Sequence, residues 1–233
     1  MKIIEQSHKI LMHTGIEMLE KAGRTCYQSQ DKIGCIGKTR NSSVDPCGRI
    51  NFDSECHQSD CKDHSSQRFV KMLRDRGHHA MIEFGDITVK FITNRGITHE
   101  LVRHRHCSFA QESTRYVKYD GEMEFIRPVW WDTSKASQRL TWEAHMKDSE
   151  FRYKTLLETG WKAQQAREIL PNSLKTEIVV KANFREFSHI LNLRCNPKAH
   201  PQMAALMRPL LIELHEKIPM VFDLLYKKYI KEA

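Results

Sequence analysis

Alternation of apolar and polar side chains is the feature that most constrains the fold of this chain. Asp86–Ile92 places Ile87, Val89 and Phe91 on one face, which is typical of a half-buried strand. Residues 176–182 (TEIVVKA) favour a second strand, and another is expected near 122–127. These strands are separated by long segments of helical period, so a mixed fold is expected rather than an all-helical one.

The helical segments show apolar residues spaced three or four apart. Met12, Ile16 and Leu19 form such a stripe near the N-terminus, and Met203, Leu206, Leu210 and Leu214 form another that is expected to be core or subunit interface. The predicted helices cover residues 8–22, 66–76, 97–106, 134–158, 161–169, 183–194, 203–214 and 220–230. With few strands and many helices, the predicted class is α+β.

One domain spanning residues 1–233 is expected, interrupted by a Cys-rich loop insertion at about 29–64. The insertion is rich in Ser, Asp, Gly and Cys and poor in large apolar residues. Cys56 and Cys61 are separated by four residues, within the loose range of zinc ligands. Cys35, Cys47, His57 and His64 lie nearby. No second close Cys pair accompanies them, so reduced thiols are the expected state and structural zinc is the alternative.

The net charge and the distribution of apolar residues limit where this protein can be located in the cell and what it can bind. Lys and Arg number 37 against 29 Asp and Glu, a net charge of +8, which favours an anionic partner without choosing among nucleic acid, nucleotides and phosphorylated cofactors. No apolar run approaches the roughly 18 residues of a membrane helix. The N-terminus lacks the apolar region of a signal peptide. We therefore expect a cytoplasmic protein that binds no membrane.

Several well-known motifs are absent. The chain has neither GxGxxG nor GxxxxGK[ST], and it lacks a GxSxG elbow. His99-Glu100 followed by His104 misses the HExxH spacing, because Arg103 stands where the second histidine is needed. We therefore expect no metal in the functional site.

The most informative segment is cationic. Residues 95–106 hold Arg95, Arg103, Arg105 and three histidines against the single acid Glu100. If the helix continues, Arg103 and Arg105 point about 200° apart and address two anionic groups or two subunits. The polar run 108–115 follows, with hydroxyl, amide and guanidinium groups suited to a phosphate. A phosphate-ligand site is favoured; a solvated basic face and a nucleic-acid patch remain as alternatives.

Ordered motifs from about residue 66 onward resemble those of one family, the flavin-dependent thymidylate synthases. Arg103-His104-Arg105, seven residues and then Ser113 match the family's RHR-x7-S signature, and Ser113-Thr-Arg115-Tyr116 resembles its continuation. The other matching blocks are Gly77-His78 with Glu83, Ala166-Arg167-Glu-Ile-Leu170-Pro171, Asn183-Phe-Arg185, Leu191-Asn-Leu-Arg194, and His200 with Gln202. Ala80 departs from the pattern, since a hydroxyl-bearing residue is usual there.

The resemblance implies a fold and a reaction. The fold is a central antiparallel sheet flanked by helices, in a homotetramer with active sites between subunits. The reaction converts dUMP to dTMP, with methylenetetrahydrofolate as one-carbon donor, reduced FAD as hydride donor and NADPH as the reductant of the flavin. The implied partners are thus dUMP, folate and nicotinamide small molecules, and no nucleic acid.

The resemblance also assigns roles to residues. The implied flavin-binding set is Arg103, His104, Arg105, Gln111, Asn183, Arg185, His189 and Glu83. The implied dUMP-binding set is Glu100, Arg103, Gln111, Glu112, Ser113, Thr114, Arg115, Arg167 and Arg194. Arg194 matches the arginine that favours the N3-ionised form of uracil, which makes it the implied catalytic residue. Ser113 has no base at an obvious spacing, so it is expected to bind dUMP rather than to attack it.

An alternative from another class is a basic nucleic-acid-binding protein with a zinc-stabilised insertion. The net charge, the Cys cluster and four Trp support it. The Arg/His segment lacks interleaved aromatic side chains for stacking on bases, which argues against it.

Overall fold

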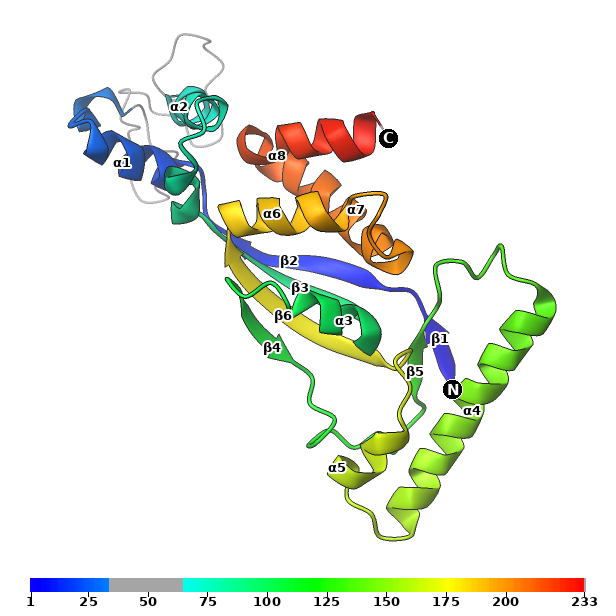
Figure 1. The fold of residues 1–233 in the computed structure, drawn as a ribbon. Coiled ribbons are helices and arrows are strands. Elements are labelled where there is room, and N and C mark those ends of the chain that lie inside the picture. Colours follow the sequence, from blue (N-terminus) through cyan, green and yellow to red (C-terminus); the bar gives the residue numbers. More distant parts are fainter. Residues whose placement is uncertain (34–64, 233) are drawn as a thin grey trace, which may run out of the picture. The chain divides into compact units, whose positions relative to one another are not determined.

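The computed structural model describes residues 1–33 and 65–232 (Figure 1). These residues form two compact units. The sheet unit comprises residues 1–11, 88–182 and 190–210, and the helical unit comprises 12–87, 183–189 and 211–233, as far as these are described. Most of the predicted insertion, with Cys35, Cys47, Cys56 and Cys61, lies outside the described residues. Its first part forms a single turn, η1 (Gln30–Lys32).

A four-stranded antiparallel sheet with the strand order β2-β3-β6-β4 lies mainly in the sheet unit. Its strands are β2 (Ser7–His13), β3 (Asp86–Asn94), β6 (Lys175–Asn183) and β4 (Ser108–Gln111). Strand β4 pairs with β6 in the register Ser108↔Lys181 to Gln111↔Ile178. In β3, Ile87, Val89 and Phe91 are buried, as the alternation predicts. Helices flank this sheet, so the predicted antiparallel sheet flanked by helices is confirmed.

Helix α3 (Arg95–Leu101) packs on this sheet through polar and apolar contacts. Asn94 caps its start, since the Asn94 side chain accepts a hydrogen bond of 2.9 Å from the Ile97 amide. The Thr98 hydroxyl accepts a hydrogen bond of 2.9 Å from the side-chain amide of Gln111. Ile97 and Leu101 of the same helix are buried. These contacts fix the end of α3, from which the basic segment leaves.

The sheet unit also contains a small parallel pair of strands, β1 (Lys2–Ile4) and β5 (Glu124–Ile126). Helices α4 (Ala136–Glu158) and α5 (Ala163–Ala166) and the turn η4 (Arg167–Ile169) follow in the chain. The core here consists of Met123, Phe125, Met146, Tyr153, Ala166 and Leu174.

The helical unit contains α1 (Glu17–Cys26), α2 (Ser65–Asp75), η3 (His79–Phe84), α8 (Pro219–Tyr226) and the π turn η5 (Lys227–Lys231). It also holds the start of α6 (Phe184–Arg194) and the end of α7 (Pro201–Lys217). Phe184 packs edge-on to Phe222 at 6.2 Å. A Cβ at Gly85 would lie 2.3 Å from the Phe184 ring, so only glycine fits there.

Two predictions of secondary structure are wrong. The segment 8–22 does not form one helix: Ser7–His13 is a strand, and α1 begins only at Glu17. Pairing of β2 with β3 outweighs the helical stripe, because a sheet edge supplies hydrogen bonds that local periodicity does not reveal. The helix expected at 97–106 is also displaced, since α3 ends at Leu101. Within the described residues, no helix is both long and apolar enough to cross a membrane.

Candidate active site

Arg194, the last residue of α6, is held by three hydrogen bonds within the sheet unit. Its Nη1 donates a hydrogen bond of 2.7 Å to Glu100 Oε2, and its Nη2 donates one of 3.2 Å to the Glu100 carbonyl oxygen. Its Nε donates a third, of 3.0 Å, to His104 Nε2. The Arg194 side chain is only 20% exposed and Glu100 34%. This arrangement joins the predicted catalytic residue to one residue of each predicted binding set.

The basic segment continues as a turn rather than as a helix. Because α3 ends at Leu101, the helical angle predicted between Arg103 and Arg105 does not apply. Both guanidinium groups are exposed, and neither has a hydrogen bond or ion pair with a described residue. His104 between them is 6% exposed. The turn therefore sends the histidine inward to Arg194 and leaves two cations available to an anionic ligand.

The polar run after the turn is already engaged in protein contacts. Gln111 in β4 donates to Thr98 and, at 3.3 Å, to Thr176. Glu112 accepts from the Tyr119 hydroxyl and lies 3.5 Å from the Lys175 ammonium. Burial and the Glu112 hydrogen bond both raise the pKa of Tyr119, so it stays protonated. Gln111 and Glu112 thus make contacts within the protein, and their ligand-binding roles stay predictions.

The remaining predicted phosphate ligands differ in exposure. Ser113 is half-buried and its hydroxyl accepts 3.3 Å from the Arg115 amide, while Thr114 is 5% exposed. Arg115 lies over the Tyr116 ring, 5.4 Å from its centroid. Arg167 in η4 is 38% exposed and pairs with Glu168 at 3.6 Å. Arg115 and Arg167 therefore present charge to solvent.

Four predicted flavin ligands lie in the helical unit. Arg185 forms an exposed ion pair with Glu83. Asn183 caps α6, because its Oδ1 accepts a hydrogen bond of 2.8 Å from the Glu186 amide. His189 is exposed. These residues and the Arg194 cluster belong to different units.

Two hollows of the sheet unit are lined by predicted site residues. Glu100 lines a cavity of about 280 Å³ that sequence reasoning did not foresee, with Trp130, Trp142, Asn172, His200 and Gln202 among its other walls. Buried Gln202 shapes this wall by accepting 2.7 Å from the Val129 amide. Gln111 and Glu112 line a separate hollow of about 590 Å³ with Lys90, Lys175 and Glu177. Within one chain, Glu100 and the Gln111–Glu112 pair thus face different cavities.

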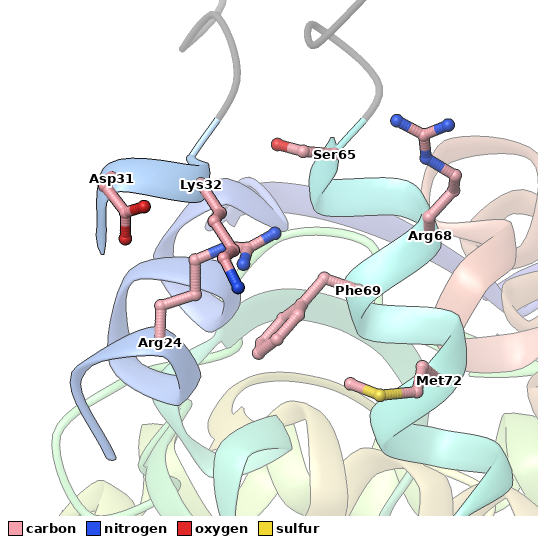
Figure 2. Close-up of a pocket in the computed structure, with 7 residues that line it drawn as sticks. All are labelled: Arg24, Asp31, Lys32, Ser65, Arg68, Phe69 and Met72. Carbon is pink, nitrogen blue, oxygen red and sulfur yellow. The ribbon is translucent and has the colours of Figure 1, made fainter. Parts of the chain in front are cut away.

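A third hollow, of about 450 Å³, lies in the helical unit (Figure 2). Phe69 and Met72 of α2 form its apolar side, and Arg24 of α1 lies 4.6 Å from the Phe69 ring centroid. Lys32 and Ser65 stand at its rim, where the described residues end (Figure 2). None of the predicted site residues lines it, and we assign it no ligand.

Of the two cysteines near the motifs, Cys195 is buried and Cys107 is partly buried. No disulfide joins Cys26, Cys107 and Cys195, the cysteines among the described residues. Burial raises the pKa of the Cys195 thiol to about 12, which keeps it protonated and unreactive.

Comparisons with known proteins agree with this arrangement of motifs. Residues 9–220 match the family model Thy1, described as thymidylate synthase complementing protein. A flavin-dependent thymidylate synthase of Corynebacterium efficiens is 29% identical over 226 residues, covering 90% of this chain and 79% of that protein. One from Geobacter sulfurreducens is 33% identical over 156 residues, covering 66% and 67%.

A crystal structure shares the fold. The UMP/dUMP methylase PolB from Streptomyces cacaoi, bound with 5-Br dUMP, matches with a TM-score of 0.72 over 98% of each chain at 17% identity. The match to the family model covers most of the chain and contains every motif described above. This chain belongs to the Thy1 family, whose curated relatives are flavin-dependent thymidylate synthases.

Proposed function

We propose that this enzyme converts dUMP to dTMP, taking the one-carbon unit from methylenetetrahydrofolate and using FAD and NADPH. The observation that carries the proposal is the anchored guanidinium of Arg194 beside the RHR turn. Methylation at uracil C5 requires electron density at that carbon, and ionisation of N3 supplies it. A guanidinium fixed before the reaction stabilises the resulting anion without reorganisation.

The pyrimidine is proposed to meet Arg194. An arginine carries five N–H donors, and three are used by Glu100 and His104, so two remain for a uracil oxygen. The nucleotide phosphate is assigned to Ser113, Thr114, Arg115, Arg167 and Arg103. The exposed guanidinium groups of Arg103, Arg115 and Arg167 support this assignment, because bidentate pairing with phosphate suits arginine.

The positive charge of the described residues is complementary to the negative charge of a flavin dinucleotide. Arg103 and Arg105 are exposed cations without described partners, as a pyrophosphate needs. Bound FAD would supply the hydride, with NADPH restoring its reduced form; the protein supplies binding and orientation. The proposed flavin set also includes His104, Gln111, Asn183, Arg185, His189 and Glu83. At position 80 the exposed alanine offers no hydroxyl, so neighbouring groups must make that contact.

We further propose a homotetramer with active sites shared between subunits. The separation of Glu100 from Gln111 and Glu112 into different hollows supports this, because a shared site draws on different faces of different copies. The family match spans residues of both units, which supports a single catalytic domain over 1–233. The absence of disulfides among the described cysteines supports a cytoplasmic location.

The decisive experiment measures cofactor and product together. The purified protein should be yellow or become so with FAD, should oxidise NADPH faster when dUMP is added, and should form dTMP only with methylenetetrahydrofolate. The Asp148→Asn variant is the matched control, because Asp148 pairs with Arg152 on the exposed side of α4. A colourless protein that binds neither FAD nor dUMP would overturn the proposal.

A further inference from the structure

We propose that Glu100 is a positioning residue that acts on the substrate through Arg194 rather than by touching the substrate itself. The catalytic consequence rests on the proposed function, whereas the anchoring rests on geometry alone. Glu100 supplies two of the three hydrogen bonds that hold the Arg194 guanidinium, one from its carboxylate and one from its backbone carbonyl.

The three contacts define the orientation of the guanidinium plane. Each of its nitrogens, Nε, Nη1 and Nη2, donates to a different acceptor atom, so rotation about the Cδ–Nε bond breaks at least one contact. A free arginine side chain has many rotamers and loses conformational entropy when it is held in one of them. Glu100 and His104 bear that cost before a ligand arrives, which leaves the remaining donors pointing in one direction.

The placement of Glu100 in the fold supports this role. Its carbonyl lies in the last turn of α3, where it accepts a backbone hydrogen bond of 3.4 Å from the Arg103 amide, and a guanidinium is a favourable additional donor there. The core residues Ile97 and Leu101 fix α3 on the sheet. The carboxylate therefore stands on a rigid element, and its Oε2 is committed to Arg194 at 2.7 Å.

Charge and geometry make opposite predictions for two conservative variants. Glu100→Gln keeps an oxygen at the right reach and removes the negative charge. Glu100→Asp keeps the charge and withdraws the oxygen by one methylene. If Glu100 acts by position, the Gln variant retains kcat within about threefold and the Asp variant loses about tenfold, since a displacement on the order of 1 Å costs up to about a hundredfold.

The experiment combines kinetics with a readout that does not need turnover. In protein with ¹⁵N-labelled arginine, the Nη1–H signal that disappears in Arg194→Lys identifies the Arg194 proton that is donated to the Glu100 carboxylate. We expect slow solvent exchange of this proton in the wild type, in Glu100→Gln and in the control Asp148→Asn. We expect exchange about tenfold faster in Glu100→Asp and Glu100→Ala. Steady-state rates should show the loss in kcat, with the KM for dUMP changed less than about threefold.

Each contrary result overturns the proposal. If Glu100→Asp outperforms Glu100→Gln, charge and not position is what matters. If both raise KM for dUMP and leave kcat and exchange unchanged, Glu100 contacts the substrate directly. If exchange is unaltered in Glu100→Asp, the carboxylate does not anchor Arg194. A wild type that forms no dTMP refutes the proposed function, but the exchange measurements still decide whether Glu100 anchors Arg194.

Discussion

Helix α6 carries an arginine of the predicted site near each end, and the two have opposite environments. Arg194 belongs to the sheet unit, is 20% exposed and makes three hydrogen bonds. Arg185 belongs to the helical unit, is 55% exposed and has only the Glu83 carboxylate, itself 43% exposed. Two of the matching sequence motifs thus contain arginines in different states. The guanidinium of Arg194 is held in place, whereas that of Arg185 remains free to reorient toward a ligand.

The largest expected effect separates these two arginines directly. In Arg194→Ala we expect dTMP formation to fall about 100- to 1000-fold, as for loss of a preorganised oxyanion donor, while bound flavin is retained. Arg185→Ala should instead weaken flavin binding and leave most of kcat at saturating FAD. Rates and the ratio of flavin to protein measure both variants. Parallel loss of flavin in Arg194→Ala would make its role cofactor binding.

A second carboxylate of the sheet unit tests whether anchored acids are costly to remove. Burial opposes ionisation of Glu150, but hydrogen bonds from Lys154, the Met1 amino group and the Met123 amide prevail and lower its pKa to about 2. Because the folded pKa lies below the unfolded value of 4.5, the stabilisation is complete above pH 4.5. It is lost as the pH falls toward about 2.

We therefore expect Glu150→Gln to lose about 2 kcal/mol of unfolding free energy at neutral pH and progressively less below pH 4.5. Urea unfolding at a series of pH values measures this difference, with Asp148→Asn as the exposed control. A destabilisation that persists unchanged in acid would show that packing, not ionisation, is responsible.

The exposed cations of the turn should behave unlike Arg194. Arg103→Ala and Arg105→Ala remove side chains without described partners, so the unfolding free energy should change by less than about 0.5 kcal/mol. The affinity for FAD or dUMP should fall about tenfold, the loss of one charge-assisted hydrogen bond. Lys147→Ala removes an exposed cation from α4 as a control. If Lys147→Ala loses the same affinity, the effect comes from the net charge of the protein and not from the position of Arg103 and Arg105.

The smallest expected effect concerns the exposed pair itself. A double-mutant cycle on Arg185 and Glu83, measured by unfolding in the absence of ligands, should give a coupling below about 1 kcal/mol because solvent screens both groups. A coupling well above that would place this pair alongside the anchored Arg194 and remove the contrast between the two ends of α6.

Local signals predicted those elements whose determinants lie within a few residues. Asn183 caps α6, and Gly77 ends α2 with a φ of +72°, as their residue types suggest. Strands β2 and β4 escaped prediction because their partners are distant in sequence. The short, polar segment Ser108–Gln111 is a strand because β6 pairs with it. Propensity carries no information about such a partner.

By itself, the sequence determined the chemistry available to this protein: the cationic RHR turn, the hydroxyl-rich run after it and the order of motifs that places it in its family. Only the tertiary structure decided which of those groups are already engaged. Glu100 and Arg194 are 94 residues apart in sequence, yet they share a 2.7 Å hydrogen bond, while Arg103 and Arg105 remain exposed. Burial and hydrogen-bond partners depend on contacts between distant segments, and these contacts turn similar arginines into anchored and available ones.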